Sequence, residues 1–175
     1  MLSKKGCQDI YTYFNSYVLE KCKGEIKWEN ILNINADAKW WQTHHIIPFY
    51  ITMDTKLQWF QYRVTHRILA TNSYLKKIRY TESDLCTFCN TEIETIMHLL
   101  CNCSSVSCLW RDLNDWINEK VIENIYIQET DVILGNNNFP KIINLLILLN
   151  DFFFIYLCKM KKKIPRFYDY ITYGA

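Results

Sequence analysis

Four side chains of the kinds that bind metals lie close together in the middle of this sequence. They are Cys86, Cys89, His98 and Cys103, with the spacing C-x2-C-x8-H-x4-C. A C-x2-C turn directs two thiolates at one point, and a histidine and a cysteine that follow can supply the other two corners of a tetrahedron. Zn²⁺ prefers such sulfur and imidazole ligands. The spacing therefore predicts a zinc site. Because protein side chains fill all four positions, the site is structural rather than catalytic.

Cys101 is an alternative fourth ligand, at H-x2-C spacing. We favour Cys103, because four intervening residues give the chain more room to turn back toward the metal. Cys108 lies further on, and we expect it to pack as a small hydrophobic residue. The other interpretation of the cluster is a set of reduced core cysteines without metal. A histidine at ligand spacing behind the C-x2-C pair makes that interpretation the weaker one.

The elements that must position these ligands are helical. The apolar periodicity predicts one compact, mainly α domain with a small central zinc knuckle. Its expected segments are an N-terminal helical segment, a basic helical segment, the zinc knuckle and a C-terminal helical segment, at 1–35, 36–84, 85–108 and 109–175. Helices are predicted near 8–22, 55–70, 74–78, 93–101, 105–119 and 141–163, with a short element near Trp28.

Single residues give finer expectations about where these elements begin and end. Gly24 and Asn72 are expected to stop the helices before them, and either Asp54 or Thr55 is expected to cap the helix at 55–70. Because Pro48 lies within an apolar stretch, residues 36–52 are expected to form an extended connector.

Composition limits the class of protein. The chain has 175 residues, of which 50% are hydrophobic and 22% charged, so it can bury a core and is not a disordered chain. The eight cysteines could form disulfides, but residues 1–9 contain no apolar stretch typical of a signal peptide. We therefore expect reduced cysteines and an intracellular protein, cytoplasmic or nuclear.

One apolar run raises the question of a membrane segment. Residues 142–158 are almost entirely apolar, but the run includes Asn144, Asn150 and Asp151. An aspartate at the centre of a bilayer costs about 2.5–3.5 kcal/mol on insertion scales. A buried helix is therefore the favoured interpretation, and a weak membrane anchor at 142–158 is the alternative.

Charge is distributed unevenly although the net charge is only +2. Residues 56–80 contain six cations and no acid, whereas residues 81–131 contain ten acids and two bases. The cationic stretch and its single histidine are candidates for contacts with nucleic-acid phosphates: Arg63, His66, Arg67, Lys76, Lys77 and Arg79. Arg63, His66 and Arg67 are expected on one helical face. The alternative is that Arg63 and Arg67 form ion pairs with the acidic segment.

Several motifs occur in a known order. They are Leu57-Gln-Trp-Phe-Gln-Tyr-Arg63, His66-Arg-Ile-Leu-Ala-Thr-Asn72, Leu85-Cys-Thr-Phe-Cys89 and Glu94-Thr-Ile-Met-His-Leu99, followed by Trp110. This order resembles the zinc-binding region that follows the reverse transcriptase in LINE-type (non-LTR) retrotransposon polyproteins. The resemblance implies that Cys86, Cys89, His98 and Cys103 bind zinc. It also implies that the region holds RNA or single-stranded DNA near the polymerase.

The resemblance does not extend to catalysis. The parent polyproteins carry a reverse transcriptase and an endonuclease, but this chain contains no Tyr-x-Asp-Asp or Ala-Asp-Asp motif and has no room for an endonuclease. The chain looks like a detached C-terminal part of such a polyprotein. We therefore expect a non-catalytic nucleic-acid-binding module, with polymerase parts of the parent as a further partner. A structural or protein-interaction module, in which zinc is only a scaffold, is the alternative.

Overall fold

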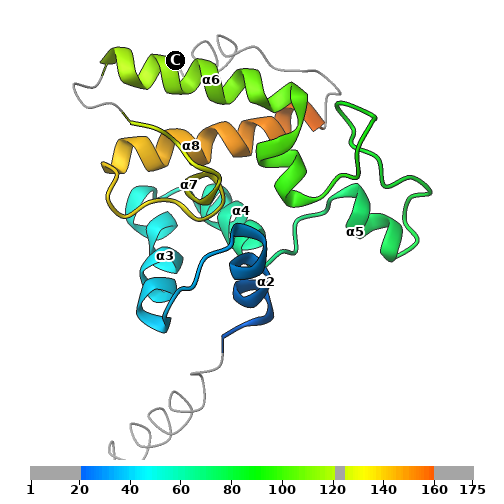
Figure 1. Ribbon diagram of the computed structural model, residues 1–175, viewed down its shortest axis with the longest axis horizontal. Helices are drawn as coiled ribbons and strands as arrows, with labels where there is room; N and C mark the ends of the chain where they lie inside the picture. Colours follow the sequence, from blue (N-terminus) through cyan, green and yellow to red (C-terminus); the bar gives the residue numbers. More distant parts are fainter. Residues whose placement is uncertain (1–20, 121–124, 160–175) are drawn as a thin grey trace, which may run out of the picture.

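The computed structural model describes residues 21–120 and 125–159, and this part of the chain is mainly helical (Figure 1). Its elements are α2 (Lys23–Leu32), α3 (Ala38–Ile51), α4 (Thr55–Thr65), α5 (Asn72–Lys77), η1 (His98–Asn102), α6 (Ser104–Lys120), α7 (Glu129–Leu134), α8 (Lys141–Phe153) and η2 (Phe154–Lys159). The only β pairing within the described residues is one antiparallel bridge between Leu85 and Ile93. The predicted class, a mainly α fold with a small central knuckle, is confirmed.

Helix α8 lies at the centre of the fold. It packs against α3, α4 and α7 on one side, and α6 covers it on another (Figure 1). Leu113 and Ile117 of α6 meet Ile143 and Ile147 of α8 in a small apolar cluster. A larger cluster joins α2, α3 and α4 to η1, and it includes two of the predicted ligands, Cys86 and Cys103. The metal centre is thus attached directly to the main core.

Helix α2 confirms the short element predicted near Trp28, but Gly24 does not end a helix. Cys22 is the N-cap and Gly24 lies in the first turn of α2. A Cβ atom on Gly24 would lie 3.0 Å from the Thr65 carbonyl oxygen, so glycine permits the close approach of α2 to the end of α4. Most of the helix predicted at 8–22 lies outside the described residues.

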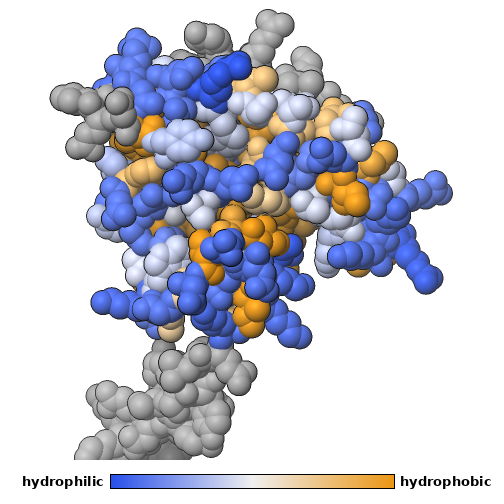
Figure 2. All heavy atoms as spheres, viewed as in Figure 1, coloured by the Kyte–Doolittle hydropathy of each residue, from blue (hydrophilic) through white to orange (hydrophobic). Residues whose placement is uncertain are grey.

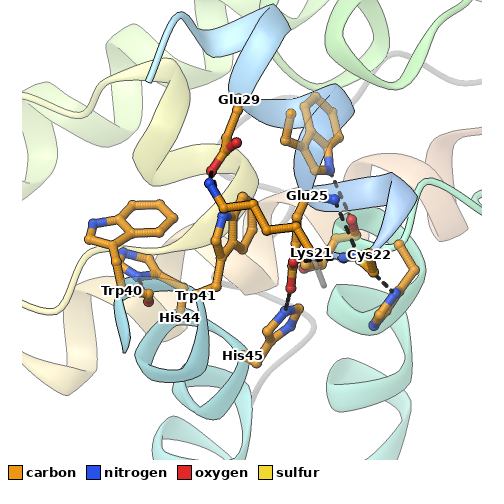
Figure 3. A network of polar contacts seen from close by, with 11 residues as sticks. Lys21, Cys22, Glu25, Glu29, Trp40, Trp41, His44 and His45 are labelled. Carbon is orange, nitrogen blue, oxygen red and sulfur yellow. Dashed lines mark hydrogen bonds and ion pairs between the residues drawn. The ribbon is translucent and has the colours of Figure 1, made fainter. Parts of the chain in front are cut away.

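Polar contacts attach α2 to α3 and α4 (Figure 3). Glu29 of α2 accepts hydrogen bonds from Lys21 and from the indole nitrogen of Trp41, and Glu25 pairs with His45 at 2.7 Å. The Trp28 indole nitrogen donates to the carbonyl oxygens of Val64 and Thr65, and Cys22 Sγ lies 4.0 Å from His66 Nδ1. These contacts fix α2 and α3 against α4, the helix on which the cationic stretch at 56–80 begins.

The extended connector predicted at 36–52 is wrong, because residues 38–51 form α3 with Pro48 inside it. Asp37 caps the helix by accepting a hydrogen bond from the Trp40 amide. Pro48 opens the last turn, so only the bond to the His44 carbonyl is lost. Pro48 and Ile47 are buried against α4, α7 and α8. Tertiary packing therefore overrides the local preference of proline.

Helix α4 begins as predicted and ends early. Asp54 caps it, and Leu57, Phe60 and Val64 are buried along one face. The helix ends at Thr65 rather than at 70, because Arg67 adopts a left-handed backbone with φ of 60°. Asn72 was expected to stop a helix but instead begins α5, which confirms the short helix predicted near 74–78.

The remaining elements follow the apolar pattern with one addition. Helix α6 matches the prediction at 105–119, and α8 with η2 covers the described part of the helix predicted at 141–163. Helix α7 was not predicted, because its six residues are too short to show a period. Ile143, Ile147 and Leu148 of the apolar run are buried in the core. Within the described residues, no helix is both long and apolar enough to cross a membrane.

Candidate metal centre

The C-x2-C segment forms a tight knuckle. The Cys86 amide donates to the Glu92 carbonyl at 2.7 Å, and the Asn90 amide donates back to the Cys86 carbonyl at 3.0 Å. Asn90 has a positive φ of 55°, a conformation that asparagine tolerates better than most residues. The Leu85–Ile93 bridge closes the loop at its base. This turn chemistry brings the sulfur atoms of Cys86 and Cys89 to the same side.

The other two ligands come from one wide helical turn. Thr95 caps it, since its hydroxyl oxygen accepts a hydrogen bond from the His98 amide at 3.0 Å. The Cys103 amide then donates to the His98 carbonyl at 2.8 Å, which is the i to i+5 bond of a π-helical turn. A turn of this width brings His98 and Cys103 to the same face, and this is the structural reason for the H-x4-C spacing.

The four donor atoms converge, and two of their separations are close to those that tetrahedral zinc requires. All four lie within 4.8 Å of one another. The sulfur atoms of Cys86 and Cys103 are 3.7 Å apart, and Cys89 Sγ is 3.4 Å from His98 Nε2. Zinc bonds of about 2.3 Å to sulfur and about 2.0–2.1 Å to nitrogen, at the tetrahedral angle, give separations of about 3.8 and 3.6 Å. The donor set therefore fits Zn²⁺.

Electrostatics at the site also favour a cation. Burial, together with the neighbouring Cys103 sulfur, raises the pKa of the Cys86 thiol to about 12. Burial also acts to raise the pKa of Cys89, but hydrogen bonds from Thr91 and Glu92 and the nearby His98 lower it to about 6. A thiolate at Cys86 thus needs a positive charge beside it, which bound zinc supplies. Three thiolates and Zn²⁺ leave one net negative charge, which backbone N–H groups directed at the sulfurs partly offset.

Cys103, rather than Cys101, joins the cluster. Cys101 lies two residues earlier on η1, and burial, with Asp151 and Glu129 nearby, raises the pKa of its thiol far above the usual range. It packs against the main core as a neutral thiol. Cys108 is exposed on α6, so the prediction that it packs as a hydrophobic residue is wrong. Cys22 and the five cysteines between residues 86 and 108 are free thiols.

Glu92 supports the histidine ligand from outside. His98 Nε2 is the nitrogen that faces Cys89, so Nδ1 carries the proton and points away from the metal. Nδ1 is buried without a hydrogen bond of good geometry in the described part of the chain, and Glu92 Oε2 lies 3.2 Å from it. This carboxylate–histidine pair fixes the tautomer and makes the imidazole a better ligand.

We expect Glu92→Gln to weaken zinc binding without unfolding the protein. The Glu92 side chain is 70% exposed, so its loss leaves no cavity, but the His98 ring loses its charged partner. Removing a partner of this kind typically lowers metal affinity by about 10- to 100-fold. Because Glu92 is exposed to solvent, we expect a loss of about 10-fold. Competition with a zinc chelator measures the change. An affinity equal to that of the wild type would show that Glu92 does not act on His98.

Glu94 has a structural role that the sequence did not reveal. Its side chain is fully buried, and one carboxylate oxygen accepts a hydrogen bond from the Asn72 amide at 2.8 Å. The other oxygen accepts from the Thr87 amide at 2.8 Å and the Thr87 hydroxyl at 2.7 Å. Asn72 also donates through its side chain to the Leu85 carbonyl. Glu94 therefore joins the first residue of α5 to the knuckle between the two cysteines.

The six candidate nucleic-acid contacts lie in two different environments. Arg63, His66 and Arg67 do not share a helical face, because α4 ends at Thr65. Arg63 donates to the Tyr156 hydroxyl, and the Arg67 guanidinium lies 4.4 Å from the centre of the Trp28 ring. Neither arginine forms a recorded ion pair with the described acidic residues.

The other three candidates, Lys76, Lys77 and Arg79, are exposed on α5 and just after it. Of these only Lys76 has a recorded ion pair, with Asp84 at 2.9 Å.

Three cysteines and one histidine of this helical module supply all four ligands that a tetrahedral zinc ion takes. Such a site defines a structural zinc-binding protein. Comparison with protein families makes the class more specific: residues 25–110 match the family described as zinc-binding in reverse transcriptase. This match confirms the resemblance to the zinc-binding region of reverse transcriptases and the predicted zinc cofactor. Trp110, the last matched residue, donates from its indole nitrogen to the Leu100 carbonyl at 2.7 Å. No curated protein gives a significant match to the chain.

Proposed function

We propose that this chain is a non-catalytic, zinc-dependent module that binds RNA or single-stranded DNA. We further propose that it is a C-terminal part of a LINE-type reverse transcriptase polyprotein. The matched family is described by zinc binding, not by polymerisation. In this proposal zinc has no chemical step to perform, and the centre serves to hold cationic side chains in place.

The observation that carries the proposal is the attachment of α5 to the metal centre. Helix α5 projects from the helical body beside the knuckle (Figure 1). Glu94 and the Lys76–Asp84 ion pair join it to the loop that supplies Cys86 and Cys89. Lys77 and Arg79 are exposed with no recorded ion pair to a described acid, and hydrophilic residues surround this arm in Figure 2. Cations held rigidly in solvent are suited to phosphate contacts.

We expect the double variant Lys77→Glu/Arg79→Glu to weaken binding and reduce its salt dependence. Each lost phosphate contact removes about 0.7 from the slope of log affinity against log salt for a single strand, so two contacts remove about 1.4. Fluorescence anisotropy with a labelled RNA oligonucleotide, titrated at several salt concentrations, measures both quantities. Zinc content should be unchanged, because neither residue touches the knuckle ligands.

Helix α2 provides a matched control. Lys23 and Lys27 are also exposed, and Lys23→Glu/Lys27→Glu changes the net charge by the same amount on a different part of the molecule. We expect this variant to bind with nearly the wild-type salt slope. Equal losses in the two variants would show a nonspecific effect of net charge. No binding by the wild-type protein would favour the other candidate function, a protein-interaction module with zinc as its scaffold.

A further inference from the structure

A second surface, away from α5, combines exposed aromatic rings with cations. Trp59 is 61% exposed and Tyr62 is 42% exposed on α4, although both are large apolar rings. Their ring centres are 5.4 Å apart at nearly a right angle. Tyr62 also contacts the His66 ring at 4.1 Å, and His66 stacks on His45 at 5.5 Å. A row of four rings therefore runs from α4 across to α3.

Cations flank the most exposed ring. Lys56 precedes Trp59 by three residues and Arg63 follows it by four, so all three lie on one face of α4. Lys56 is exposed, and no ion pair is recorded for Lys56 or Arg63 with an acid in the described residues. Arg63 is held in place by its bonds to the Trp59 carbonyl and the Tyr156 hydroxyl. Aromatic surface between fixed cations suits a ligand that offers flat rings along an anionic backbone.

A shallow groove continues the aromatic surface toward α3. Phe49, which is 61% exposed, borders it together with Tyr62 and Gln58. The groove is too small to enclose a base, so recognition there uses ring faces rather than a pocket. The bases of a duplex stack on one another and do not offer their faces, whereas those of a single strand do.

We infer that Trp59 and Tyr62 form a stacking platform for unpaired bases of single-stranded RNA or DNA, whose phosphates Lys56 and Arg63 contact. This inference rests on the proposed nucleic-acid function and deepens it, since it adds a base-contacting surface to the phosphate contacts of α5. The platform tolerates any base, because every base has an aromatic face. It requires no conformational change of the Trp59 ring, which already lies in solvent.

The test compares two probes of equal length, an oligouridylate RNA and an abasic oligonucleotide with the same number of phosphates. The wild-type protein should prefer the oligouridylate. Trp59→Ala should reduce affinity for the oligouridylate by about 5- to 150-fold, the equivalent of one stacked base, and leave affinity for the abasic probe nearly unchanged. Trp59→Phe should recover part of the preference. Because Trp59 is largely exposed, we expect both variants to keep their zinc and their helical content.

Tyr126→Ala is the control, since Tyr126 is even more solvent-exposed than Trp59, at 77% against 61%, but follows α6 rather than lying on α4. It should keep the full preference for bases. Equal wild-type affinity for the two probes would overturn the platform while leaving the proposed function intact. Binding of neither probe would overturn both. Loss of self-association in Trp59→Ala, without any change in RNA affinity, would assign the face to a protein contact and also overturn the platform.

Discussion

Cys86→Ser is expected to abolish zinc binding and the cooperative folding of the knuckle. Cys86 is fully buried and belongs to the main apolar core, so the centre and the core are parts of one structure. Structural zinc contributes about 10–16 kcal/mol of binding free energy in small zinc domains, which is comparable to or greater than the total stability of about 5–15 kcal/mol that ordinary domains have. Serine keeps the size of the side chain but does not supply a thiolate.

Atomic absorption and thermal unfolding followed by circular dichroism measure the two effects. Wild-type protein should contain close to one zinc per chain, and a chelator should lower its unfolding temperature. Cys86→Ser should contain none and should unfold at the temperature of the chelated wild type. Cys101→Ser and Cys108→Ser are the matched controls, because neither residue belongs to the cluster. Zinc loss in Cys101→Ser would overturn the choice of Cys103, and a wild-type protein unaffected by chelator would overturn the centre itself.

The sequence could predict the metal centre because the ligand spacing is itself a local structure. A C-x2-C turn directs its two side chains at one point, and so does an H-x4-C turn. Cys86, Cys89, His98 and Cys103 could therefore be grouped without knowing the fold. The structure adds the reason why Cys103 rather than Cys101 belongs to this group, because an ordinary α-helical turn and a π-helical turn rotate the side chains differently. Only the Cys103-to-His98 hydrogen bond shows which turn is present.

Other errors arose where tertiary packing determines local conformation. Pro48 disfavours a helix locally, yet α3 continues through it because Ile47 and Pro48 pack against three other helices. Arg67 carries no sequence signal for a left-handed backbone, and its position over Trp28 depends on how α2 approaches α4. In the sequence Glu94 is one more acid in a negative segment, because the partners of its carboxylate, Asn72 and Thr87, lie 22 and 7 residues earlier and only the fold brings them to it.

Glu94→Gln is expected to destabilise the protein by about 3–5 kcal/mol, because a buried carboxylate would be replaced by a group that cannot accept at both ends. The carboxylate receives three hydrogen bonds, from the Asn72 amide and from the amide and hydroxyl of Thr87. An amide side chain has the same shape, but its NH₂ group would face either the Asn72 or the Thr87 N–H group. Two donors would then oppose each other where no water can relieve them.

The consequence for function should separate zinc binding from nucleic-acid binding. Glu94 is not one of the four metal ligands, so Glu94→Gln should still bind zinc under conditions where it is folded, whereas α5 should lose its attachment to the knuckle. We expect the amides of α5 to exchange faster than in the wild type, while those of α6 change less. RNA binding should weaken, because Lys77 and Arg79 are then no longer held in place. Urea unfolding, zinc content and exchange measure the three effects. Glu82→Gln is the matched control, since it makes the same chemical change on an exposed side chain that belongs neither to the metal centre nor to the contacts of Glu94. A Glu94→Gln protein with wild-type stability and unchanged exchange in α5 would show that the carboxylate does not join the metal centre to the cationic arm.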